Sequence, residues 1–179
     1  TALLGFIPTR HEGKVTGLAA FGNSTETGRI LGERLTYSPA TRSPLVRGYY
    51  QRPELDYLRT ALANFSREDI AAGVQHVLEE VETRYIDDNI PNPRGTAIVL
   101  SGGVAANVRL NQKIRDLGFR DVYVFPHMGD GGLAVGACYA ANSETTGPGR
   151  NQPLTDVYLG TGYTDAEIEA ALKSSGFNW

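Results

Sequence analysis

Residues 98–111 read IVLSGGVAANVRLN, and this stretch decides the predicted fold. Its first part is a short apolar run, typical of a buried parallel strand. A Ser-Gly-Gly turn follows and leads into a helix that we expect over about residues 104–117. Gly102 and Gly103 can adopt positive φ and let a ligand approach bare backbone. The helix start would offer unpaired N–H groups to a phosphate. The alternative is a tight strand-to-helix connection without a ligand.

The same pattern returns further along the chain. Residues 121–126, DVYVFP, predict a second strand, and HMGDGG at 127–132 forms a second glycine-rich turn before a small-residue helix at 133–141. A repeated order of strand, glycine turn and helix indicates an α/β fold with parallel strands. In such sheets, sites gather where the carboxyl ends of strands meet helix starts. Both turns are therefore expected at one edge of the sheet.

The segments before this region predict mainly helices. Residues 10–22 suggest a loop and a short helix that ends near Gly22, and 53–65 and 66–88 suggest two longer helices, with Ser66 as an N-cap. Residues 1–9 predict a strand and turn. Residues 23–53 predict a surface excursion in which 29–37 forms a hairpin arm.

The long helix at 66–88 has an apolar stripe and an acidic stretch. The stripe comprises Ile70, Val74, Val77, Leu78, Val81 and Tyr85. Glu79, Glu80 and Glu82 are interpreted as a solvated face, and His76 as an ordinary surface residue. On this interpretation the helix packs by one side only.

Composition excludes several classes of protein. The chain has 179 residues, 41% of them hydrophobic, enough for a folded core. A net charge of −3 and a pI near 5.6 do not support a nucleic-acid partner. No apolar run approaches the ~20 residues of a membrane span. Cys138 is the single cysteine, which we expect to be buried, and its isolation indicates a reducing, cytoplasmic setting.

Three polar residues stand out as candidates for chemistry. Asp130 lies between glycines after a strand, where a carboxylate can hold a phosphate-bridging metal ion or simply cap the next helix. Glu12 would contact a ligand hydroxyl or form a salt bridge with Lys14 or Arg10. Asn107, placed one turn inside its helix, would donate to a ligand beyond Gly103. Three histidines without paired spacing make a complete metal site from this chain alone improbable.

Residues 12–22, 101–111 and 129–137 resemble the NodU/CmcH-type O-carbamoyltransferases. The likeness covers nearly the whole chain in order. It implies one lobe of an actin/hexokinase-like ATPase fold, which is ribonuclease H-like. Residues 1–145 would be the second lobe of the actin-like domain, and 146–179 a linker and the start of a YrdC-like C-terminal domain. The second stretch is also similar to tRNA threonylcarbamoyl-transferase proteins.

The resemblance implies a mechanism. Carbamoyl phosphate and ATP would form carbamoyl-adenylate in the YrdC-like domain, and the actin-like domain would pass the carbamoyl group to a hydroxyl-bearing acceptor. A divalent metal ion would assist: iron by resemblance, with magnesium and manganese as alternatives. By motif position Asp130 matches the metal ligand, and Glu12, Gly102, Gly103 and Asn107 match the nucleotide contacts.

The chain also departs from that family pattern. The family's metal site needs an H-x-x-x-H pair and a further aspartate from the N-terminal lobe, which this sequence lacks. We therefore expect a fragment of a larger protein that is inactive alone. A lobe of an actin-like small-molecule kinase and a non-catalytic nucleotide-binding module are the alternatives.

Overall fold

The computed structural model describes residues 1–48, 52–149, 154–158 and 160–176. Residues 49–51 of the predicted surface excursion and 150–153 of the predicted linker lie outside the described residues. The chain forms two compact units, residues 1–135 and 136–179. Each unit is described by itself.

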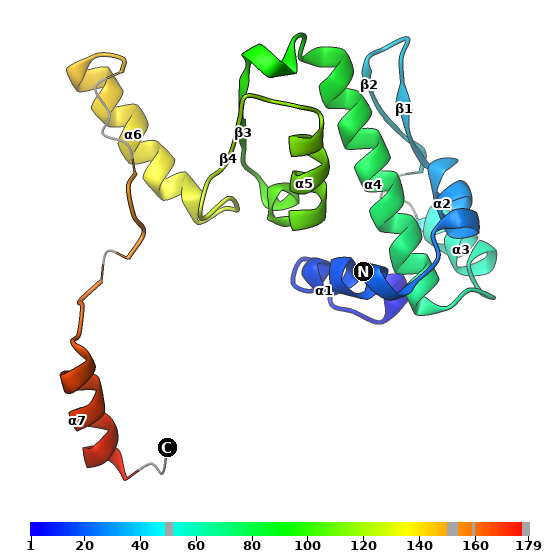
Figure 1. Ribbon diagram of the computed structural model, residues 1–179. Helices are drawn as coiled ribbons and strands as arrows, with labels where there is room; N and C mark the ends of the chain where they lie inside the picture. Colours follow the sequence, from blue (N-terminus) through cyan, green and yellow to red (C-terminus); the bar gives the residue numbers. More distant parts are fainter. Residues whose placement is uncertain (49–51, 150–153, 159, 177–179) are drawn as a thin grey trace. The chain divides into compact units, whose positions relative to one another are not determined.

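The first unit is built around one long helix, α4 (Arg67–Asn89), which runs through the middle of the unit in Figure 1. Its other helices and strands are α1 (Glu12–Leu18), α2 (Thr25–Gly32), β1 (Leu35–Ser38), β2 (Ser43–Val46), α3 (Arg52–Ala61), β3 (Ala97–Leu100), α5 (Val108–Asp116) and β4 (Asp121–Val124). Short 3₁₀ helices, η1 to η4, cover Ala2–Leu4, Ala19–Phe21, Pro93–Gly95 and Gly103–Ala106. The unit is thus mixed α/β and mostly helical, which confirms the fold class at that level. The actin-like lobe stays a prediction.

Strands β3 and β4 pair in parallel, as the repeated pattern predicts. Their register runs from Ala97 opposite Asp121 to Leu100 opposite Val124. Ile98 is buried, in a cluster with residues of α4 and α5, whereas Val99 is 67% exposed. The prediction of a fully buried strand is therefore wrong, because the described residues cover only one face of this two-stranded sheet.

Helix α4 begins as the sequence predicts but packs by more than one side. The Ser66 hydroxyl accepts a hydrogen bond from Asp69 N at 3.0 Å, which confirms Ser66 as the N-cap. Val74 and Tyr85, assigned to the apolar stripe, are exposed, and Gln75 is 5% exposed in their place. The reason is that α1, α2, α5 and β1 all contact this helix. A single stripe cannot describe a helix with neighbours on several sides.

Helix α2 takes the place of part of the predicted hairpin. Residues 29–32 are helical, so the predicted hairpin arm over 29–37 is wrong for its first half. The hairpin that does form is β1–β2, in antiparallel register. Thr27 is fully buried and donates to the Asp69 carbonyl at 2.6 Å. Residues 23–48 thus contain packed structure as well as surface loops.

The chain start is a 3₁₀ turn and not the predicted strand. Gly5 has φ 70°, a left-handed conformation that ends η1. Leu4 is buried in a cluster with Val15 and Leu62. The packing of this leucine explains why the apolar chain start folds back onto the helices. A strand would need a neighbouring strand to pair with, and no described strand lies beside the chain start.

We predict that Gly22 cannot carry a side chain. It follows η2 against the start of α4, and a Cβ atom there would overlap the Glu68 carbonyl and lie 2.6 Å from Asp69 N. Because both neighbours are backbone atoms, Gly22→Ala should lower the free energy of unfolding by about 1–3 kcal/mol in chemical denaturation. Gly17→Ala is the matched control. A Cβ at Gly17 meets no atom within 4 Å, so this change should be neutral or stabilise by about 0.5–1 kcal/mol. Equal losses for both variants would contradict the packing argument.

Two helices follow the sheet. Helix α6 (Gly132–Thr146) has no buried residue, and Cys138 on it is exposed, so the predicted burial of Cys138 is wrong. Helix α7 (Asp165–Ser175) begins with a capping box of Thr164 and Glu167. Within the described residues, no helix combines the length and apolarity needed to cross a membrane.

Candidate functional site

The two glycine turns lie side by side at the carboxyl ends of β3 and β4. Gly102 N donates to the Met128 carbonyl at 2.6 Å, and Phe125 N donates to the Leu100 carbonyl at 3.3 Å. Parallel pairing brings the strand ends to one edge, and these bonds extend the contact into the loops. The structure therefore brings Gly102 and the loop of Asp130 together, as the sequence predicts.

The backbone of the first turn is open. Gly102 has φ 95°, which a side chain would strain, whereas Gly103 is not in the left-handed region. A Cβ at either glycine would meet no atom within 4 Å. The described residues thus give no steric reason for glycine at position 103. Bare backbone facing open space is what a closely approaching ligand requires.

The turn does not lead straight into a long helix. The 3₁₀ turn η4 intervenes, and α5 begins only at Val108, so the predicted helix over 104–117 is wrong in its first turn. Asn107 is the N-cap of α5 and not a residue inside it. The helix dipole therefore starts five residues after Gly103 and is capped by a side chain, which weakens the expectation that it faces a phosphate.

The amide of Asn107 uses its whole hydrogen-bonding capacity within the chain. Its Oδ1 accepts from Leu110 N at 3.0 Å and from Gln75 Nε2 at 3.1 Å. Its Nδ2 donates to Gln75 Oε1 at 2.8 Å and to Thr16 Oγ1 at 3.3 Å. An asparagine amide offers two donors and two acceptor sites, so all four are occupied. In this conformation Asn107 positions the turn, and its contact with a nucleotide stays a prediction.

Gln75 is the residue of this region that sequence reasoning missed. It lies on α4 among apolar side chains, is 5% exposed, and joins Asn107 to Glu79 through an Nε2–Oε1 hydrogen bond of 2.7 Å. Glu79 in turn forms an ion pair with Arg109 Nε at 3.2 Å and is 12% exposed. The predicted solvated face is therefore wrong at Glu79. A signal was present, because Gln75 and Glu79 have the i, i+4 spacing of a helical pair.

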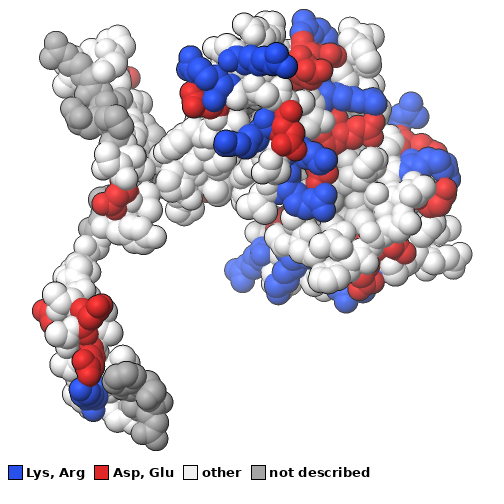
Figure 2. Space-filling view, in the orientation of Figure 1, with Lys and Arg blue, Asp and Glu red and all other residues white. Residues whose placement is uncertain are grey.

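This buried network differs from the charges on the surface. Lys and Arg are interspersed with Asp and Glu over the face of the first unit shown in Figure 2. One ion pair of the first unit joins Arg84 to Glu80 at 2.9 Å, with both side chains exposed. Exposed pairs of this kind contribute little to stability. The buried network instead joins α1, α4 and the start of α5. It thereby connects α1, which begins at Glu12, to the first glycine turn.

Glu12 lies at the first residue of α1 and makes local contacts. Its Oε1 accepts from Thr9 N at 2.6 Å and from Thr1 Oγ1 at 3.3 Å. Hydrogen bonds from its own backbone N–H and from that of Thr9 hold the pKa of this carboxyl below its ordinary value of 4.5. The alternative of a salt bridge to Lys14 or Arg10 does not appear among the described contacts. Glu12 is exposed, and its role toward a ligand stays a prediction.

We predict a pH signature for Glu12. A carboxyl whose folded-state pKa is lowered stabilises the fold above its unfolded value and loses that effect as pH falls through the folded-state pKa. Wild type and Glu12→Gln should therefore differ most near neutral pH and converge below the ordinary value of 4.5. Thermal unfolding from pH 3 to pH 7 measures this. Glu26→Gln, on the exposed Arg29 pair of α2, is the control and should track wild type throughout. A constant difference between Glu12→Gln and wild type would contradict the prediction.

The second turn is shaped by His127. A Cβ at Gly131 would overlap the His127 imidazole, and one at Gly132 would overlap the His127 carbonyl. Gly132 is therefore required by the fold of this loop, because the atom it would meet is backbone, whereas the exposed imidazole beside Gly131 can rotate away. Asp130, beside them, is exposed, and its side chain has no hydrogen bond or ion pair within the described part of the chain. Its carboxylate is free to bind another group.

The described residues do not by themselves form a metal centre. No group of three or more His, Cys, Asp or Glu side chains comes together among them. Asp130 offers one carboxylate, whereas a divalent cation takes several ligands. A metal ion at Asp130 would need further ligands, which the described residues do not bring together there.

Comparisons with known proteins agree with the motifs. Residues 1–141 match the family described as carbamoyltransferase N-terminus. An uncharacterised protein of Methanocaldococcus jannaschii is 29% identical over 97% of this chain and 29% of its own length, and a second is 33% identical over 78% and 28%. Nodulation protein NolO of Bradyrhizobium diazoefficiens is 36% identical over 62% of this chain and 23% of its own length. The chain thus spans less than a third of these relatives.

Proposed function

The chain belongs to the carbamoyltransferase family, and from this premise we propose that it is part of an enzyme that transfers a carbamoyl group to a hydroxyl-bearing acceptor. The carbamoyl group would come from carbamoyl-adenylate, made from carbamoyl phosphate and ATP. The acceptor would be a small molecule or an oligosaccharide. One observation carries the proposal: the family match spans both glycine turns, which Gly102 N and the Met128 carbonyl join at one sheet edge.

The open backbone supports a ligand at this edge. Gly103 faces space in which a Cβ would meet no atom, and the same is true of Gly13 and Gly17 on α1. Glycine disfavours a helix interior, so two in the seven residues of α1 call for a reason other than helix stability. A nucleotide lying against bare backbone supplies that reason. We therefore assign the adenylate to the surface formed by the first turn and α1.

The transfer step places simple demands on the chain. The acceptor oxygen bonds to the carbamoyl carbon, the bond from that carbon to the adenylate oxygen breaks, and AMP leaves while the hydroxyl proton passes to a base. Backbone N–H groups at the open turn would hold the phosphate and stabilise the negative charge that the leaving group develops. When bound, a divalent cation would supply Lewis-acid polarisation. Asp130 would provide one of its ligands.

The remaining parts of the site would come from outside this chain. The relatives are more than three times as long as the stretch they share with it. We propose that an N-terminal lobe completes the metal site and that a C-terminal YrdC-like domain makes the adenylate. On this view the 179-residue chain is inactive alone.

Nucleotide products test the proposal. The full-length protein is incubated with ATP, carbamoyl phosphate and a panel of hydroxyl-bearing sugars, and nucleotides are separated by chromatography. We expect AMP and pyrophosphate, formed only when carbamoyl phosphate is present, together with a carbamoylated sugar detected by mass spectrometry. ADP with a phosphorylated sugar would instead indicate a small-molecule kinase. ATP binding without turnover would indicate a non-catalytic module, and either result would overturn the proposal.

A further inference from the structure

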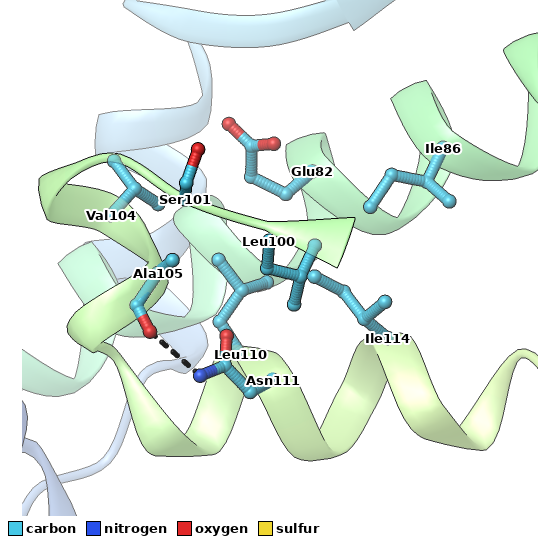
Figure 3. A pocket seen from close by; sticks show the side chains of 9 residues that line it. All are labelled: Glu82, Ile86, Leu100, Ser101, Val104, Ala105, Leu110, Asn111 and Ile114. Atoms are coloured by element: carbon cyan, nitrogen blue, oxygen red, sulfur yellow. Dashed lines mark hydrogen bonds between the residues drawn. The ribbon is translucent and has the colours of Figure 1, made fainter. Parts of the chain in front are cut away.

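A small cavity lies behind the first glycine turn, between α4, the end of β3, η4 and α5 (Figure 3). Its volume is about 130 Å³, room for a group of a few heavy atoms. Most of its wall is aliphatic, from the same side chains that form the core of this part of the unit. Three polar side chains interrupt that wall: Glu82, Ser101 and Asn111. We refer to this cavity as the Glu82 pocket.

Asn111 presents an unused acceptor in this pocket. Its Nδ2 donates to the Ala105 carbonyl at 2.7 Å, shown as the dashed line in Figure 3. Because a carbonyl can only accept, this bond fixes which end of the amide is nitrogen. Asn111 Oδ1 is then buried and has no hydrogen-bond partner within the described residues. Buried polar atoms without a partner are uncommon in folded proteins, so this oxygen requires an explanation.

Glu82 presents a second acceptor. Burial alone raises the pKa of its carboxyl, and no hydrogen bond or ion pair with a described residue offsets that burial. The predicted solvated face is therefore wrong at Glu82 as well. Figure 3 shows its carboxylate beside the Ser101 hydroxyl at one end of the pocket. The pocket thus combines apolar walls with a carboxylate, an amide oxygen and a hydroxyl, and none of the described residues that line it carries a cationic side chain.

We propose that the Glu82 pocket binds the NH2 group of a small primary amide, with Glu82 and Asn111 Oδ1 as hydrogen-bond acceptors. This inference rests on the proposed function, because the carbamoyl group carries such an amide. An NH2 group donates two hydrogen bonds, one for each unused acceptor. The assignment makes Glu82 and Asn111 specificity-determining residues that distinguish NH2 from CH3. A site built to accept hydrogen bonds rejects an analogue that cannot donate them, because its own buried groups are left unpaired.

Ligand-observed NMR on the full-length protein tests this without relying on turnover. Acetamide is the probe, and acetone, in which CH3 replaces NH2 at the same shape, is its matched control. We expect saturation transfer to acetamide and at least about tenfold weaker binding of acetone. Asn111→Leu and Glu82→Leu should each weaken acetamide binding about tenfold. Glu82→Gln, which keeps an acceptor oxygen, should restore it.

The choice of variants separates a loss of binding from a loss of folding. Asn111→Leu also removes the bond to the Ala105 carbonyl and therefore risks disturbing η4. Glu82→Leu removes only a half-buried carboxyl without a partner among the described residues, so this variant should fold. A loss of acetamide binding in Glu82→Leu can then be attributed to the missing acceptor. Ile114→Val, on the apolar wall, changes the shape but no acceptor and should bind acetamide as wild type does.

The outcomes separate this inference from the proposed function. Equal binding of acetamide and acetone, or unchanged binding in Glu82→Leu, would overturn the inference even if carbamoyl transfer is observed. Binding of methylammonium but not acetamide, abolished in Glu82→Gln, would replace the amide site by a cation site. Acetamide binding in a protein that makes no carbamoylated product would refute the proposed function. The Glu82 pocket would then still be an amide-binding site, but for a different reaction or ligand.

Discussion

Replacing Asp130 by alanine in the full-length protein is expected to lower carbamoyl transfer by about 100-fold or more. The expectation follows from the proposed role of this carboxylate as a metal ligand at the edge where β3 and β4 end. Asp130 is exposed and has no hydrogen bond or ion pair within the described residues, so its removal should leave the melting temperature unchanged. Metal content of the purified protein is a second readout and should fall together with activity.

Asp121→Ala is the matched control for this prediction. Asp121 begins β4, its side chain is 69% exposed, and it pairs only with the neighbouring Arg120 at the surface. We expect less than a twofold change in transfer for this variant, because exposed pairs contribute little. Wild-type activity and metal content in Asp130→Ala would exclude a ligand role. The alternative that Asp130 caps the next helix has no support either, because α6 begins at Gly132 and the Asp130 side chain makes no hydrogen bond within the described residues.

Gln75→Leu is expected to lower the free energy of unfolding by about 2–4 kcal/mol. The change removes one hydrogen bond from each of two atoms of the Asn107 amide and from Glu79 Oε1 in a largely buried place, and each of these atoms keeps one other partner. The same change should raise KM for ATP more than it lowers kcat, because the network holds the turn and α1 together but touches no reacting atom. Urea denaturation and steady-state kinetics measure the two effects.

A double-mutant cycle gives this prediction its control. Asn107→Ser keeps a good N-cap residue for α5 but is too short to reach Gln75. If the two amides act through each other, the loss in the double variant should be smaller than the sum of the single losses by about 0.5–3 kcal/mol. Strict additivity would show that Gln75 stabilises the fold independently of Asn107.

The sequence predicts best where local chemistry decides the structure. The Ser66 cap and the parallel pairing of residues 97–100 with 121–124 follow from short patterns, and the structure confirms them. The glycine turns are also where the pattern predicts, because parallel strands end at a common edge. The fold of each of these features depends on residues that are near neighbours in the chain.

Prediction fails where distant segments compete for one helix. Gln75 and Glu79 are buried because α1 and α5 approach α4 from sides that its apolar stripe does not mark. The sequence predicts Asn107 inside a helix because a 3₁₀ turn and an α-helix have similar composition. Only the hydrogen bond from Leu110 N to Asn107 Oδ1 shows where α5 begins. The unused Oδ1 of Asn111 cannot be predicted from the sequence. It is unused because the Asn111 amide is oriented by its hydrogen bond to the Ala105 carbonyl.

The hydrogen bond between Gly102 N and the Met128 carbonyl has a consequence for motion. Local opening in proteins proceeds by cooperative segments, and a bond of 2.6 Å between two loops joins them into one such segment. The Gly102 amide proton is therefore a natural reporter. Its rate of exchange with deuterated solvent should slow when a ligand binds at either loop. Exchange mass spectrometry of the peptide that contains Gly102 would therefore report binding near Asp130, which lies 28 residues later in the chain.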